Sequence, residues 1–211
     1  MAANDSNVGV KIVSSTNANF VGRKCVVINN QNIPASRDMN MEPVFLDVTR
    51  QDYNLDTETM SKFLDKKTLN KNEINDYSLF LNHKYARNLV YKDRNFEILV
   101  VCWKPGQKAP IHGHEGEKCW MRIEAGSLQI SNYRLLSSNP ISLKLLSQDH
   151  LDEGCLDGPA EIHSVENISN ENAISLHVYT KPFNKCDVFY PEKGIVERKS
   201  LAYDSINKIP C

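Results

Sequence analysis

From Tyr85 onward the chain is a succession of short apolar segments separated by turn residues. The segments read FEILVVCW, KCWMRIEAG, SLQISNYRLL, ISLKLL and AISLHVYT, and Gly, Pro and Asn punctuate the run. Several short strands in a row with such punctuation are typical of a β-sandwich or a β-barrel. Upstream, Met60, Phe63 and Leu64 recur at three- and four-residue spacing, and a second such run follows around Ile74. We therefore expect a mainly β domain preceded by short α-helices.

Length and composition limit what such a chain can do. Its 211 residues can bury the core of one domain, and 25 basic against 26 acidic residues give nothing that would recruit nucleic acid or an anionic membrane. It lacks a membrane-length apolar run, a signal-peptide pattern and any Cys-x-x-Cys pair among its six cysteines. We expect a cytoplasmic monomer with its domain over residues 41–211. Residues 1–40, rich in Asn and Ser, are expected to be a flexible extension with at most one short strand, at 25–28.

Three histidines are candidates for a metal site. His112 and His114 are two residues apart, so on a strand both side chains point to the same face. A metal held there would have nitrogen ligands at about 2.0–2.1 Å, with a third ligand from another strand, for which His163 is the candidate. A His-x-His pair alone is more often a surface or packing feature than a metal site.

The residues around the histidines strengthen this interpretation. In the stretch GQKAPIHGHEGEKCWMRIEAG at 106–126, a glycine, the two histidines, Cys119 and a second glycine follow one another at intervals of five, one, four and six residues. This spacing resembles the first motif of the cupin superfamily, and His163 to Asn167 resembles the end of the second. The resemblance implies a cupin, jelly-roll-like β-barrel that binds a metal. The proline and glycine expected before the second motif are displaced, because this chain has Gly158 and Pro159 instead.

Cys119 stands where cupins usually have a glutamate ligand. Three neutral imidazoles without a carboxylate would leave the metal a full dication, which favours a thiolate from the substrate. The chain is similar here to the cysteine dioxygenase family, the thiol dioxygenase branch of the cupins. It shares that family's RNLV at 87–90, VENIS at 165–169 and SLHVY at 175–179. The resemblance implies one Fe(II) per chain on the three histidines, and oxidation of free L-cysteine by O2 to cysteine sulfinic acid, a step of cysteine catabolism toward taurine or sulfate.

The same resemblance suggests which residues bind the substrate. In the family an arginine binds the substrate carboxylate, and Arg87 stands at its position, with Tyr85 matching a tyrosine two residues before it. A planar guanidinium suits this role because it can donate two parallel hydrogen bonds to a carboxylate.

A second group of residues is expected to act beside the metal. Ser175, His177 and Tyr179 alternate along one segment, so they share a strand face. The resemblance implies that Tyr179 donates a hydrogen bond to bound substrate or oxygen, with His177 and Ser175 supporting it. Family members can also form a thioether between the cysteine and the tyrosine that match Cys119 and Tyr179. Cys186 matches a further family cysteine near the mouth of the site.

Alternative functions stay open at this point. A related thiol dioxygenase would act on 3-mercaptopropionate or cysteamine, but those relatives lack an arginine at the position of Arg87. A zinc cupin isomerase is disfavoured by Cys119, and a non-catalytic metal-binding cupin by the presence of all three histidines. One departure concerns the loop after Tyr179. The mammalian family members have Ser-Pro-Pro-Phe there with a cis bond, whereas this chain has TKPF at 180–183, so either a costly cis bond is kept or the loop differs.

Overall fold

The computed structural model describes residues 11–12, 62, 64 and 71–211, and these residues form a mainly β structure. The elements in chain order are β1 (Lys11–Ile12), α3 (Lys71–Asp76), β2 (Ala86–Lys92), β3 (Glu97–Trp103), β4 (Lys108–Gly113), β5 (Cys119–Ala125), β6 (Ser127–Ser138), β7 (Ile141–Asp152), β8 (Cys155–Asp157), β9 (Ile162–Glu166), β10 (Ala173–Tyr179), β11 (Lys185–Tyr190), the 3-10 helix η1 (Pro191–Lys193), β12 (Ile195–Ser200), β13 (Ser205–Ile206) and β14 (Ile209–Pro210). Lys62 and Leu64 are also helical. The expected mainly β fold with minor helices ahead of the strands is therefore confirmed.

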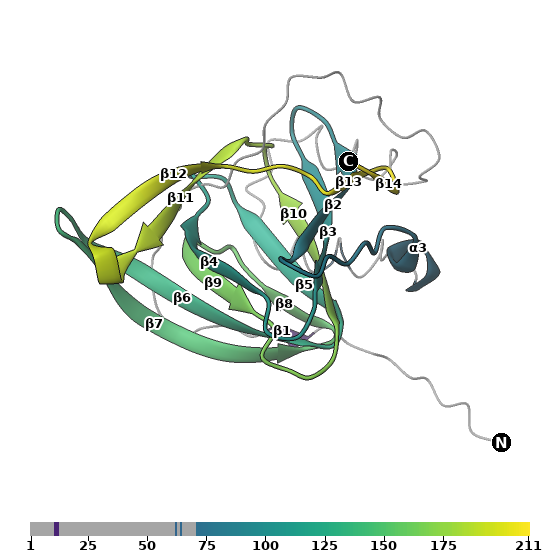
Figure 1. Cartoon of the computed structure of the whole chain (residues 1–211), viewed down its shortest axis with the longest axis horizontal. Coiled ribbons are helices and arrows are strands. Elements are labelled where there is room, and N and C mark those ends of the chain that lie inside the picture. Colours follow the sequence, from purple (N-terminus) through teal and green to yellow (C-terminus); the bar gives the residue numbers. More distant parts are fainter. Residues whose placement is uncertain (1–10, 13–61, 63, 65–70) are drawn as a thin grey trace.

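The strands form two sheets. The larger sheet has the order β1-β8-β5-β10-β3-β2-β13-β14, and the smaller has the order β12-β11-β4-β9-β6-β7. In Figure 1, the long strands β6 and β7 run along one side of the molecule and α3 lies on the opposite side. The sheets are separate and do not close into one continuous barrel, an arrangement that fits a cupin jelly roll.

A hydrophobic core fills the space between the sheets. Leu89 and Val101 of the larger sheet belong to the same buried cluster as Ile130 and Val165 of the smaller sheet. The opposite face of the larger sheet is covered as well, since a second cluster there includes Ile74 of α3. With apolar contacts on both faces, all seven residues of β3 and all seven of β10 are buried. This double burial explains why these two strands read as nearly continuous apolar runs.

Strand pairing determines where the polar residues of these buried strands lie. β10 is paired with β3 on one side and β5 on the other, and Tyr179 is opposite both Glu97 and Cys119. In the smaller sheet, β4 is paired with β9, and His112 is opposite His163. Residues paired side by side project to the same face of a sheet. The candidate site is consequently assembled between the two sheets.

Two glycines allow close backbone approaches near the site. Gly126, at the end of the metal-binding motif, has φ +71°, and a Cβ there would lie 2.6 Å from the carbonyl oxygen of Asn172. Gly158 has φ +131°, and a Cβ there would lie 2.6 Å from the carbonyl oxygen of Cys119. A larger residue at either position would have to displace backbone. Gly158 thus lets the segment before β9 pass directly over Cys119.

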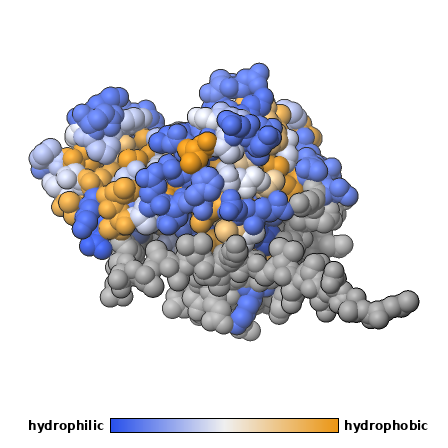
Figure 2. Space-filling view, turned by 90° about the horizontal axis from the view of Figure 1, so that it is seen from below, coloured by the Kyte–Doolittle hydropathy of each residue, from blue (hydrophilic) through white to orange (hydrophobic). Residues whose placement is uncertain are grey.

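Several expectations concern the surface and the chain termini. Large apolar side chains are exposed on the β6–β7 hairpin, among them Leu136 and Leu145, and Figure 2 shows a face where hydrophobic and hydrophilic residues are interspersed. Among the described residues, no helix has the length and apolar character to cross a membrane.

Within residues 1–40 only β1 is described, paired parallel to β8. The segment 25–28 lies outside the described residues, so the flexible extension, the domain boundary at residue 41 and the monomeric state stay predictions.

Candidate functional site

The three histidines expected to bind a metal lie together between the sheets. His112 is on β4, His114 follows directly after β4, and His163 is on β9. The ring centroids are 5.2 Å apart for His112 and His114, 4.7 Å for His112 and His163, and 4.5 Å for His114 and His163. One nitrogen of each ring lies within 4.8 Å of the others. The sequence spacing placed two of these rings on one face, and the β4–β9 pairing adds the third.

Hydrogen bonds leave nitrogens of this cluster available to a metal. The Nδ1 atoms of His112 and His114 donate to the carbonyl oxygens of Pro110 and Ala160, each at 2.8 Å, because a carbonyl can only accept. Nε2 of His114 and Nδ1 of His163 are buried without a hydrogen-bond partner. Buried polar atoms are rarely left unsatisfied, so these orphaned nitrogens fit metal ligation.

The electrostatic environment also suits a cation. Burial lowers the pKa of His112 to about 4 and that of His114 to about 3, and it lowers the pKa of His163 well below the usual value. All three imidazoles are therefore neutral at pH 7 with lone pairs available, the form that a metal requires. The donor set of three imidazoles is suited to iron, zinc, copper or nickel.

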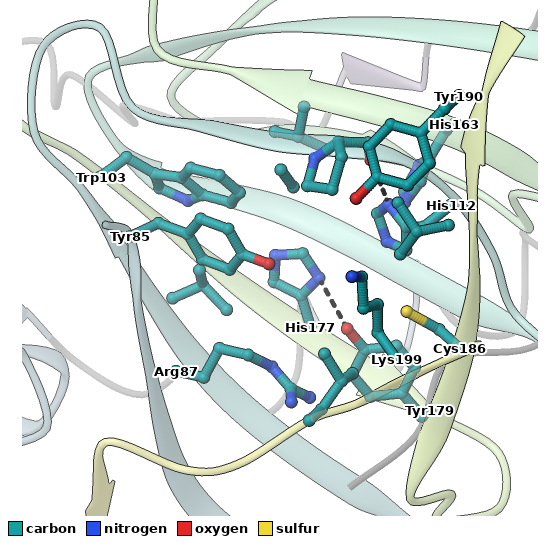
Figure 3. A pocket seen from close by; sticks show the side chains of 16 residues that line it. Tyr85, Arg87, Trp103, His112, His163, His177, Tyr179, Cys186, Tyr190 and Lys199 are labelled. Carbon is teal, nitrogen blue, oxygen red and sulfur yellow. Dashed lines mark hydrogen bonds between the residues drawn. The ribbon is translucent and has the colours of Figure 1, made fainter. Parts of the chain in front are cut away.

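Ser175, His177 and Tyr179 form a directed hydrogen-bond chain along the inner face of β10. Nε1 of Trp103 donates to Oγ of Ser175 at 2.9 Å, and Oγ of Ser175 lies 2.9 Å from Nε2 of His177. An indole N–H can only donate, so Ser175 accepts from it, and the Ser175 hydroxyl hydrogen remains available for donation to Nε2 of His177. Burial lowers the pKa of His177, so the ring is neutral, and its Nδ1 lies 3.3 Å from the Tyr179 hydroxyl oxygen (Figure 3). In the tautomer in which Nε2 accepts from Ser175, the single ring proton is on Nδ1, and Tyr179 accepts it.

Tyr179 and Cys119 are neighbours across β10 and β5. They are paired in register, and a hydrogen bond joins the phenol to the thiol. Burial raises the pKa of the Cys119 thiol, so it is protonated at neutral pH. Cys119 is 2 % exposed and Tyr179 4 % exposed, with the edge of the Tyr179 ring against Phe183. In the described part of the chain, cis bonds occur before Pro140 and Pro159 and none before Lys181, so the loop after Tyr179 differs from the mammalian pattern.

A pocket of about 160 Å³ opens beside His112 and His163, and Arg87 lines it from β2. The backbone N–H of Arg87 donates to Oδ2 of Asp204 at 2.9 Å, which ties β2 to the C-terminal segment. Figure 3 shows the guanidinium directed into the pocket. Tyr85 also lines the pocket and is stacked on Trp103, with ring centroids 4.7 Å apart. The two residues expected to bind substrate thus lie on the same wall.

Glu97 is a charged residue of this site that was not expected from the sequence. It is completely buried, and its carboxylate lies 3.7 Å from Nη2 of Arg87 and 3.4 Å from Nζ of Lys92. Burial raises the pKa of Glu97, while the charges of Arg87 and Lys92 oppose that change. The sequence does contain a signal that could have identified Glu97, because it is the one acidic residue of the otherwise apolar strand EILVVCW.

Three further residues that line the pocket were not predicted from the sequence. Trp103 donates the first hydrogen bond of the chain that runs through Ser175 and His177 to Tyr179. It lies on the same face of β3 as Glu97, because alternate residues of a strand share a face. Tyr190 and Lys199 line the opposite side of the pocket, where Cys186 also lies (Figure 3). Lys199 is on β12, paired with Cys186 of β11. No pattern in the mostly exposed segment IVERKS distinguishes this lysine from a surface residue.

Comparison with known sequences gives a consistent assignment to one family. The family model described as cysteine dioxygenase type I matches residues 29–192. Human cysteine dioxygenase type 1 is 29% identical over 134 residues, 61% of this chain and 67% of the human protein. The Danio rerio protein of the same name is 28% identical over 153 residues, 68% of this chain and 75% of its own length. A solved Klebsiella pneumoniae protein with a double-stranded β-helix domain is 18% identical and covers 61% of this chain and 92% of its own, with a TM-score of 0.43.

Proposed function

Because the chain belongs to the cysteine dioxygenase type I family, we propose that it oxidises the thiol of free L-cysteine with O2 to cysteine sulfinic acid. The cofactor in this proposal is one Fe(II) per chain, and the setting is cysteine catabolism in the cytoplasm. One observation carries the proposal. Among the residues that the structure describes, three neutral imidazoles converge without a carboxylate in the group, beside a pocket that contains a buried arginine.

The histidines would hold the metal through nitrogens that no backbone carbonyl occupies. His112 and His114 would use Nε2, because their Nδ1 atoms are committed to Pro110 and Ala160. When bound, Fe(II) supplies the redox chemistry by which both atoms of O2 are added to the substrate sulfur. Neutral ligands leave the full cationic charge in the site, which lowers the pKa of a bound thiol from its usual value of about 8.5 and favours the thiolate.

Arg87 and Tyr85 would orient the substrate. Arg87 is 6 % exposed, so a substrate carboxylate that reaches it is desolvated, and a hydrogen bond to a charged group contributes about 1.5–3 kcal/mol. Anchoring the carboxylate on this wall leaves the thiol of a small amino acid near the histidines, which is a contribution of proximity and orientation. Cysteamine has no carboxylate and would lose this anchor.

Tyr179 would donate a hydrogen bond at the reacting end of the substrate. In the tautomer of His177 in which Nε2 accepts from Ser175 and Nδ1 carries the proton, Tyr179 accepts from Nδ1 and its phenol hydrogen points away from His177. The contact between Tyr179 and Cys119 supports a thioether between the sulfur and the phenol ring. Its formation removes one hydrogen from the thiol and one from the ring, with O2 as the oxidant.

Metal analysis combined with oxygen uptake tests the proposal. Wild type should contain up to one equivalent of iron and consume O2 with L-cysteine, and alanine at His112, His114 or His163 should abolish both. His150→Ala is the matched control, because His150 is largely exposed on β7 and should change neither. Uptake with 3-mercaptopropionate or cysteamine but not with L-cysteine would favour the related thiol dioxygenases. Full iron content in a variant of one of the three histidines would remove it from the ligand set.

A further inference from the structure

Glu97 is buried beside Arg87, which lines the pocket, and the proposed reaction gives Glu97 no role. We propose that Glu97 determines specificity: it holds the net charge around Arg87 at plus one, so that the pocket selects thiols with a single carboxylate. This inference rests on the proposed role of Arg87 in binding the substrate carboxylate. It adds that a second residue, Glu97, determines the selectivity of Arg87. The Glu97 carboxylate positions the guanidinium and partly neutralises its charge.

The position of Glu97 supports a role in the site. Across four adjacent strands, Lys92, Glu97, Tyr179 and Cys119 form one row of paired residues. The row places a buried carboxylate between a cation and the phenol at the centre of the site. Glu97 also begins the face of β3 that continues through Val101 to Trp103, both of which line the pocket.

The charges around Glu97 can be counted from its contacts. Arg87 and Lys92 are both within ion-pair distance, at 3.7 Å and 3.4 Å, and Nζ of Lys92 also donates to the Tyr203 hydroxyl at 2.8 Å. A protonated Glu97 would leave two cations of like charge together in a buried cluster. Burial raises the pKa of Glu97, but the ionised form is the one that the two adjacent cations require, because an uncompensated buried charge is strongly destabilising. Two positive charges and one negative charge give this wall a net charge of plus one; the other cation of the pocket lining, Lys199, lies on the opposite side.

A net charge of plus one matches one carboxylate. A substrate carboxylate on Arg87 shares the guanidinium with Glu97, so the two anions repel each other at close range in a site of low dielectric constant. The first carboxylate brings the cluster to neutrality, whereas a second would make it negative. Glu97 thus permits a monocarboxylate thiol and opposes a dicarboxylate thiol of similar size.

Binding without turnover tests this inference. Dissociation constants would be measured by calorimetry, on iron-loaded protein without oxygen, for 2-mercaptoethanol, 3-mercaptopropionate and mercaptosuccinate, which carry zero, one and two carboxylates. Wild type should bind 3-mercaptopropionate more tightly than 2-mercaptoethanol and gain nothing further with mercaptosuccinate. Glu97→Gln keeps the shape and removes the charge. It should tighten binding by about tenfold for each carboxylate and leave 2-mercaptoethanol unchanged.

Two further variants make the test decisive. Lys92→Gln should change the dissociation constants of the three thiols in the opposite direction, weakening binding for each carboxylate. If Glu97→Gln does not fold, Lys92→Gln alone tests whether the net charge sets the selectivity. Glu124→Gln is the matched control, because Glu124 forms a buried ion pair with Arg122 outside the pocket and should not alter the series. Equal changes for all three thiols in both pocket variants would overturn the inference. Since no oxidation is needed, a chain that shows these shifts yet never oxidises L-cysteine would refute the proposed function alone.

Discussion

Replacing Ser175 by alanine should break the hydrogen-bond chain at its centre. The Ser175 hydroxyl accepts from Nε1 of Trp103 and, in the tautomer of His177 with the proton on Nδ1, donates to Nε2 of His177, each at 2.9 Å, and the residue is completely buried. Alanine leaves a buried donor and a buried acceptor without partners, and each such group costs about 1–3 kcal/mol. We expect the free energy of unfolding to fall by about 3 kcal/mol, measured by urea denaturation.

Ser175→Ala should also impair the hydrogen bond that Tyr179 donates to the substrate, because Ser175 is connected to Tyr179 through His177. Once Ser175 no longer donates to Nε2 of His177, the ring can carry its proton on either nitrogen, and the Tyr179 hydroxyl can donate to Nδ1 instead of toward the substrate. Losing one hydrogen bond of this kind corresponds to about a tenfold fall in kcat/KM for L-cysteine. In a Tyr179→Phe background the hydroxyl is already absent. There, Ser175→Ala should lower kcat/KM by less than about twofold.

Ser205 provides a matched control for this cycle. It is also a buried serine, and its hydroxyl donates to Oδ1 of Asn88 at 2.7 Å, away from the pocket. Ser205→Ala should lower the stability but leave kcat/KM unchanged. If Ser175→Ala reduced kcat/KM by the same factor with and without the Tyr179 hydroxyl, the relay from Ser175 to Tyr179 would be refuted.

Three other outcomes are expected. Arg87→Ala should lower kcat/KM for L-cysteine by about 1.5–3 kcal/mol and for cysteamine much less, and an equal loss would indicate a structural role. After aerobic turnover, mass spectrometry should find a fraction of the protein lighter by two hydrogens, with a linked peptide that Cys119→Ser and Tyr179→Phe each eliminate; its absence from wild type would exclude the thioether. Burial, with the charge of Asp149, raises the pKa of Asp157 to about 6, so stability should fall as the pH rises from about 4 through 6. Asp157→Asn should therefore be more stable than wild type by about 3 kcal/mol at pH 7.5 and equally stable at pH 3; a constant difference would contradict this assignment.

Local periodicity was sufficient for part of the fold and the site. The alternation of Ser175, His177 and Tyr179 predicted a shared strand face, and the structure has all three on the inner face of β10 in one hydrogen-bond chain. The His112 and His114 spacing similarly predicted convergence on one point. Both inferences need only the period of two within a single strand.

Other features depend on which strands are neighbours, and one sequence does not specify this. The bond between Trp103 and Ser175 joins residues 72 positions apart through the β3–β10 register. The position of His163 opposite His112 likewise follows from the β4–β9 pairing, and before that it rested on a family resemblance. Lys199 enters the pocket because β12 is paired with β11 at its rim, although its segment reads as an exposed strand.

Oxygen-isotope labelling tests the central claim most directly. Iron-loaded protein would be incubated with L-cysteine under labelled O2, and the product would be analysed by mass spectrometry. We predict cysteine sulfinic acid in which both sulfinate oxygens carry the label, with one O2 consumed for each molecule of product. Oxidation to cystine, or a sulfinate that takes an oxygen from water, would contradict a dioxygenase acting on free L-cysteine.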